Sequence, residues 1–162
     1  MKKLILVPLL VLAACSADPN PYSTITDDDY HSLGIGLHER RDRYALRYLV
    51  GVDPSRVAWC AAYVDYVLET FHNVQGTGSL LAKSYLRWGI PISEPDLWDV
   101  VVFERNGPGW EGHVGFYVGE TIINGRVYYW ILGGNQNDSV TIELYPRSEV
   151  LGIRRAYYDE IV

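Results

Sequence analysis

Apolar residues follow helical spacing in the first half of the chain. Residues 59–71 carry a broad apolar face at the spacing of an α-helix and predict a buried helix. Residues 38–50 place apolar side chains among arginines, which predicts an amphipathic helix with a solvated basic face, ended by Gly51. A third helix is expected over residues 79–88, with Ser79 as its cap.

The spacing changes after Pro91, where short runs rich in β-branched and aromatic residues begin. The dipeptide Asn124–Gly125 between two of these runs is a strong signal for a two-residue hairpin turn. Helices followed by consecutive strands predict an α+β fold with an antiparallel sheet. The expected strands span residues 99–104, 113–118, 126–132, 140–144 and 151–155.

The N-terminus has the layout of a secretory signal, with two lysines before the apolar run Leu4–Ala14. Residues Leu12–Cys15 resemble the lipobox of bacterial lipoproteins, in which the cysteine is acylated after cleavage. We therefore expect a signal peptide over residues 1–14, lipidation of Cys15, a flexible tether over residues 15–29 and a single domain over residues 30–162. The alternative is an ordinary secretory signal cut near Ala14.

The resemblance also implies a location. Ser16 follows the cysteine, where aspartate signals inner-membrane retention in Gram-negative lipoproteins. The expected place is therefore the cell envelope, on the periplasmic face of the outer membrane if the host is Gram-negative. The anchor makes the membrane a partner of the protein.

Charge and cysteine content narrow the function. Loss of Lys2 and Lys3 with the signal leaves 12 of the 14 basic residues against 20 acidic ones, a net charge of −8. This balance argues against nucleic acid as a partner, because phosphates demand a basic surface. Cys15 and Cys60 are the only cysteines, so lipidation leaves one thiol and no intramolecular disulfide. A single thiol in an exported protein is either buried or functional.

Cys60 stands where the helix of residues 59–71 begins. The positive end of a helix is expected to lower the pKa of a thiol there, and its free N–H groups suit the oxyanion of an acyl-transfer intermediate. This position favours a nucleophile over the alternative, an inert buried cysteine.

A nucleophilic thiol needs a base within hydrogen-bond reach, and His113 is the best candidate. His72 lies about 18 Å from Cys60 along the same helix at about 1.5 Å per residue, which is too far. His31 and His38 fall in or near the tether and the arginine-rich helix. His113 opens a strand after a glycine-rich segment that leaves room for a substrate.

An orienting partner for the His113 ring is expected at the end of the neighbouring strand. If Asn124 and Gly125 form the turn, undisturbed pairing places His113 opposite Gln136, and Asn135 reaches it only through a β-bulge. Register alone therefore favours Gln136. No metal-binding motif and no serine-hydrolase motif competes with this arrangement, so we expect no metal and no cofactor.

An ordered set of motifs resembles the NlpC/P60 and CHAP superfamily of papain-like peptidoglycan peptidases. The resemblance covers about residues 36–156, and it implies helices packed on a five- to six-stranded antiparallel sheet with a Cys60, His113 and Asn135 triad. Many CHAP members carry a glutamate at the position of Gly133, which is a departure here. The motifs are Trp59–Val64, Gly76–Ser79, Ser84–Gly89, Glu94–Pro95, Asp99–Phe103, Gly112–Gly119, Gly133–Gln136 and Tyr145–Ser148.

The function implied is hydrolysis of stem peptides or cross-bridges of peptidoglycan by a monomeric cysteine endopeptidase. An amidase cutting between muramic acid and alanine is a close alternative for the same site. Two further alternatives are a non-catalytic lipoprotein that binds the envelope and an acyltransferase in which an amine replaces water.

Overall fold

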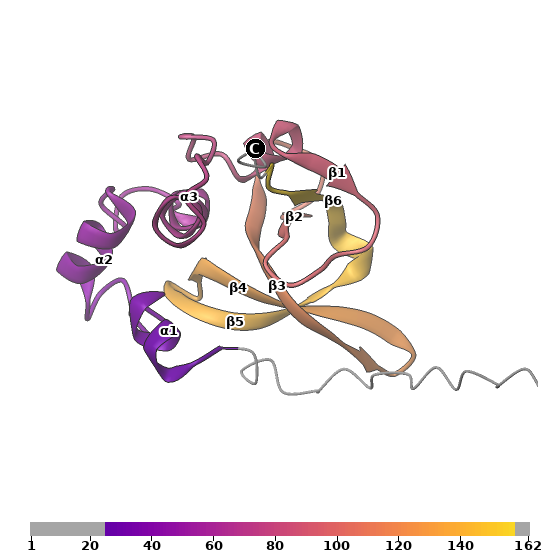
Figure 1. Cartoon of the computed structure of the whole chain (residues 1–162), viewed down its shortest axis with the longest axis horizontal. Helices are drawn as coiled ribbons and strands as arrows, with labels where there is room; N and C mark the ends of the chain where they lie inside the picture. Colours follow the sequence, from indigo (N-terminus) through magenta and orange to yellow (C-terminus); the bar gives the residue numbers. More distant parts are fainter. Residues whose placement is uncertain (1–24, 158–162) are drawn as a thin grey trace, which may run out of the picture.

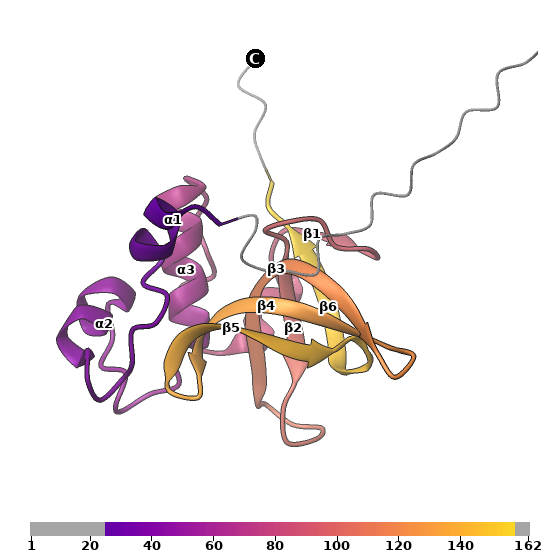
Figure 2. The same ribbon diagram turned by 90° about the horizontal axis from the view of Figure 1, so that it is seen from below.

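The computed structural model describes residues 25–157, which form helices grouped beside an antiparallel sheet (Figures 1 and 2). The helical elements are α1 (Asp27–Ser32), α2 (Arg43–Val50), α3 (Cys60–Phe71) and two 3₁₀ turns, η1 (Ala82–Arg87) and η2 (Arg147–Glu149). The strands are β1 (Ile90–Ile92), β2 (Val100–Glu104), β3 (Gly112–Ile123), β4 (Arg126–Gln136), β5 (Ser139–Pro146) and β6 (Val150–Arg155). The expected α+β class and antiparallel sheet are confirmed.

The expected signal peptide and Cys15 lie outside the described residues. Within residues 25–157, no helix has the length and hydropathy needed to cross a bilayer.

The six strands pair in the order β1-β6-β2-β3-β4-β5, and neighbouring strands are antiparallel throughout. Asn124 and Gly125 form the predicted two-residue turn, and both have positive φ (51° and 75°), as a type I′ turn requires. Ile123 pairs with Arg126 across that turn. The short strand β1, which the hydrophobic pattern did not indicate, pairs with β6 at one edge of the sheet.

Helix α3 is the main element that packs on the sheet. Its buried residues, including Tyr63 and Val67, share one core with Val114 and Phe116 of β3 and Leu132 of β4. Burial of such apolar side chains contributes about 1.5–3 kcal/mol each. This packing places the beginning of α3 against the sheet, where Cys60 lies.

Contact between the helix and the sheet is close at Gly134. A Cβ atom at this position would lie 2.6 Å from both a ring carbon of Trp59 and the Cβ of Tyr63. Any larger residue would push α3 away from β4.

The N-terminal elements differ from the sequence-based prediction. Thr26 and Asp29 form a capping box, so residues 27–29 are the first turn of α1 and not the end of a tether. Helix α2 begins at Arg43 rather than near residue 38. Residues 36–39 instead run along the outer edge of β5, where Gly36 N–H donates to Val140 O and Val140 N–H donates to Leu37 O.

The helix expected over residues 79–88 is the shorter 3₁₀ turn η1. Ser79 Oγ accepts a hydrogen bond from Leu81 N–H, which closes a turn before the helical residues begin. The next residues are held from outside, because a guanidinium N–H of Arg154 donates to Leu86 O. Such tertiary contacts override the local preference for an α-helix.

Candidate functional site

Cys60 is the first residue of α3, and its side chain is buried, with 3% of the residue exposed. Burial raises the pKa of the thiol, while the backbone N–H groups of Val114, Ala61 and Cys60 itself act in the opposite direction. The net result is a raised pKa, although the expected lowering by the N–H groups at the helix start is present. The N–H groups of the helix start are in place, but desolvation outweighs them.

His113 is the second residue of β3 and is 1% exposed. Its ring stacks on Tyr145, with centroids 4.9 Å apart and planes inclined by 11°. Its Nε2 atom lies 2.9 Å from Gln136 Oε1. The imidazole is therefore fixed by one aromatic face and one hydrogen bond.

The Gln136 amide is oriented by its other contacts. Gln136 Nε2 donates to Thr141 O at 2.7 Å and to Ile131 O at 3.3 Å. Because the amide nitrogen is committed to these carbonyls, Oε1 faces the ring and must accept a hydrogen bond. His113 Nε2 then carries the proton, and Nδ1 has the lone pair that a general base needs.

The hydrogen-bond partner of the imidazole is Gln136, the residue that undisturbed register favoured, and not Asn135, which the resemblance implied. The strands nevertheless do not pair without disturbance. Gly119 pairs with Trp130 but Tyr117 pairs with Ile131, which places a bulge at Val118. A second shift follows in β4, where Asn135 adopts a left-handed backbone (φ 59°).

Gly133 explains how Gln136 reaches the ring. A Cβ atom at Gly133 would lie 2.8 Å from Gln136 Oε1 and 3.1 Å from His113 Nε2. Any side chain at position 133 would therefore enter the space that the Gln136 amide occupies. Glycine at position 133 therefore leaves the room that Gln136 needs to reach the ring.

Cys60 and His113 belong to one corner of the molecule, at the start of α3 and the start of β3. The thiol lies against the backbone N–H of Val114, the residue that follows His113. It also raises the pKa of Tyr145, on which His113 stacks, although burial is the larger cause. Nδ1 of His113 has no hydrogen-bond partner within residues 25–157, so the thiol and the imidazole are not hydrogen-bonded to each other.

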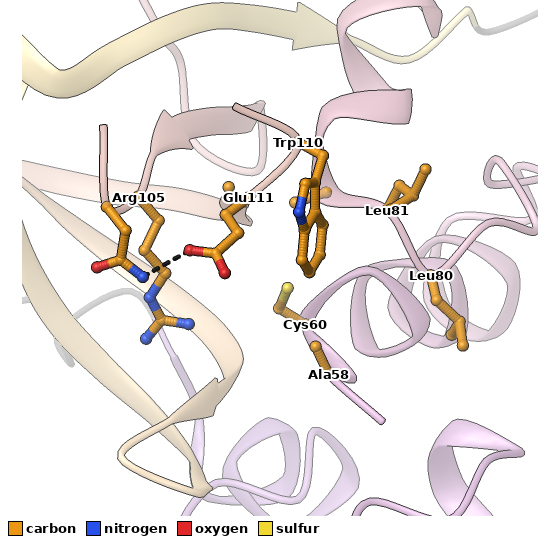
Figure 3. Close-up of a pocket in the computed structure, with 10 residues that line it drawn as sticks. Ala58, Cys60, Leu80, Leu81, Arg105, Trp110 and Glu111 are labelled. Atoms are coloured by element: carbon orange, nitrogen blue, oxygen red, sulfur yellow. Dashed lines mark hydrogen bonds between the residues drawn. The ribbon is translucent and has the colours of Figure 1, made fainter. Parts of the chain in front are cut away.

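A pocket of about 190 Å³ opens at Cys60, and it is lined by residues of η1 and of the β2–β3 loop. In Figure 3 the sulfur points toward the Trp110 indole, with Leu80 and Leu81 to one side. A second hollow of about 420 Å³ is lined by His113 and Tyr145. Arg105 and Asn106 line both.

The other histidines lie elsewhere. His72 caps the far end of α3 and packs on Trp98 and Phe116. His38 Nδ1 accepts a hydrogen bond from Arg40 N–H, and His31 is exposed in α1. In the described part of the chain, no cluster of three His, Cys, Asp or Glu side chains is arranged to hold a metal ion.

These features define an α+β protein with a buried cysteine, and a buried histidine held by a glutamine, at one end of its sheet. No protein-family model matches the chain, and no curated protein matches it.

The buried imidazole makes stability depend on pH. Burial lowers the pKa of His113 from 6.5 to about 4. Between these two pH values the unfolded chain binds a proton on this imidazole and the folded chain does not. Stability is therefore lost as the pH falls from 6.5 toward 4, by about 2–3 kcal/mol at pH 4.5. Urea unfolding of the wild type and His113→Leu at pH 7 and pH 4.5 measures this. Between pH 7 and pH 4.5 the free energy of unfolding should fall by about 2–3 kcal/mol more in the wild type than in the variant. Equal losses would contradict a buried, neutral His113.

Proposed function

We propose that this protein is a papain-like cysteine peptidase or amidase of the NlpC/P60 and CHAP type that cleaves peptidoglycan. One observation carries the proposal. Gln136 holds the His113 ring with its proton on Nε2, so Nδ1 is free. The backbone N–H of Val114, the next residue of the same strand, contacts the Cys60 sulfur. A thiol at a helix start and an oriented, unprotonated imidazole are the two groups that acyl transfer through a cysteine requires.

The state of the pair sets the mechanism. Burial raises the pKa of Cys60 and lowers that of His113, so both groups are neutral at pH 7. The proton therefore moves from sulfur to Nδ1 as the sulfur attacks the amide carbon. The sulfur and Nδ1 must move into hydrogen-bond distance for this transfer, as is common when substrate binds.

The rest of the reaction follows from the same groups. The N–H groups around the sulfur suit the oxyanion of the tetrahedral intermediate. His113 then gives its Nδ1 proton to the leaving amine as the C–N bond breaks. Water, losing a proton to Nδ1, attacks the thioester, and the thiol leaves with that proton. Lipidation of Cys15 would hold the enzyme beside its polymer in the envelope.

Digestion of purified peptidoglycan sacculi tests the proposal. The purified protein should release soluble fragments, and mass spectrometry of their ends identifies the bond. Both cuts leave a new amine on a peptide, and the new carboxylate distinguishes them. A stem-peptide or cross-bridge cut places it on a peptide, and an amidase cut places it on the lactyl group of muramic acid. A product in which an added amine replaces water would identify an acyltransferase. Release of no fragment under any condition would contradict catalysis.

One observation favours a second function. Both Cys60 and His113 are almost fully buried, and they share no hydrogen bond within the described part of the chain. These features also suit a non-catalytic protein that keeps the fold and binds the envelope. Co-sedimentation with sacculi separates the two functions, because a binder retains sacculi equally well with and without Cys60 and releases nothing.

A further inference from the structure

The loop between β2 and β3 carries a cation to the centre of the candidate site. Arg105 follows the last residue of β2, and its side chain lines both the Cys60 pocket and the hollow that contains His113. Lys83 Nζ donates to Gly109 O at 2.5 Å and ties this loop to η1. This contact holds the loop against η1.

Arg105 has no carboxylate partner within residues 25–157. The nearest candidate in the loop, Glu111, accepts a hydrogen bond from Asn106 Nδ2 at 2.6 Å instead (Figure 3). By contrast, Arg155 bonds to both Asp96 and Asp99. The guanidinium at the pocket is therefore free to bind an anion that enters it.

The position of Arg105 also matters electrostatically. Burial is the largest influence on the pKa of Cys60, of His113 and of Tyr145, and Arg105 lowers all three in addition. It thus acts on the thiol, the imidazole and the phenol of this corner, in pockets that Glu104, Glu111 and Glu149 also line. The chain as a whole has a net charge of −6, so an anionic substrate meets a repulsive field except near such a cation.

We propose that Arg105 binds a free carboxylate of the substrate peptide, close to the amide bond that Cys60 attacks. The inference rests on the proposed function and names its substrate class, a peptide with a carboxylate beside the cleaved bond and an aliphatic group next to it. A guanidinium holds a carboxylate through two parallel hydrogen bonds. Leu80, Leu81 and Trp110, on the pocket wall, provide the apolar contact for the aliphatic part.

Two stem peptides that differ only at this carboxylate provide the test, one with the free acid and one with the carboxamide. The wild type should have a kcat/KM at least about tenfold higher for the acid, the effect expected of a charged hydrogen bond. In Arg105→Gln this ratio should fall close to 1, mainly through the acid substrate. Arg87→Gln is the matched control, because Arg87 is also exposed and unpaired in the described residues but lines neither pocket. It should keep the wild-type ratio.

Binding measurements separate this inference from the proposed function. In a Cys60→Ala background, calorimetry should show tighter binding of the acid than of the carboxamide, and Arg105→Gln should remove the difference. If the wild type cleaves both peptides with equal kcat/KM, the carboxylate site is wrong and the hydrolase stands. If no peptide is cleaved but the acid binds through Arg105, the carboxylate site is supported and the proposed hydrolase activity is wrong. Equal binding of both peptides to the Cys60→Ala protein would overturn the inference in either case.

Discussion

Replacing Cys60 with alanine is expected to reduce fragment release from sacculi to background, a loss of about 10⁴-fold or more. The variant has no nucleophile, and no other cysteine exists within residues 25–157 to replace it. His113→Ala should give a loss of similar size, because the thiol is neutral and needs a base to become nucleophilic. Release of new amino groups from labelled sacculi measures both.

A change in another histidine is the control for these two variants. His31 is exposed in α1, and His31→Ala should leave the rate unchanged. Thermal unfolding must accompany the assays, since both Cys60 and His113 are buried and their loss leaves small cavities. A folded Cys60→Ala protein that still releases fragments would contradict the catalytic role of this thiol.

Replacing Gln136 with leucine is expected to lower kcat by about 10- to 100-fold, the cost typical of losing an orienting contact behind a functional histidine. Leucine keeps the volume but removes the acceptor for the His113 Nε2 proton. The proton is then no longer held on Nε2, and the ring loses its fixed tautomer. The same change leaves Thr141 O without its short hydrogen bond and should cost about 1–3 kcal/mol of folding free energy.

Nitrogen NMR of the imidazole gives a readout that a general loss of stability does not move. In the wild type the ring should be in the Nε2–H form, and in Gln136→Leu the two tautomers should mix. Asn135→Gly is the matched control, because glycine adopts the positive φ at position 135 without strain. It should keep both the tautomer and the rate. A large loss in Asn135→Gly with none in Gln136→Leu would restore Asn135 as the orienting residue.

Periodicity was sufficient to predict the elements whose side chains are consistently buried on one side. The helix after Trp59 was predicted to within a residue because its apolar face is broad. The β3–β4 hairpin followed from Asn124–Gly125, since few other dipeptides adopt two positive φ angles. The positions of Cys60 at a helix start and of His113 at the beginning of a strand came from these local signals alone.

Features that depend on contacts distant in the sequence were not predicted. Two bulges, at Val118 and near Asn135, precede the contact between Gln136 and the ring, and a residue pattern does not fix where a bulge forms. The effect of the helix on the thiol was visible in the sequence, but the depth of burial that outweighs it was not. Strand β1 is three residues long and contains Pro91, so it carried too little pattern to be recognised.

The contact of residues 36–39 with β5 has a consequence for handling the protein. A sheet that ends in an uncovered strand offers a row of backbone donors and acceptors to a neighbouring molecule. Here backbone groups of Gly36, Leu37 and Glu39 hydrogen-bond to Val140 and Asp138, so the beginning of the β5 edge is covered. Shortened versions that begin beyond residue 39 would lack this cover and would tend to self-associate through β5, even with Cys60, His113 and Gln136 intact.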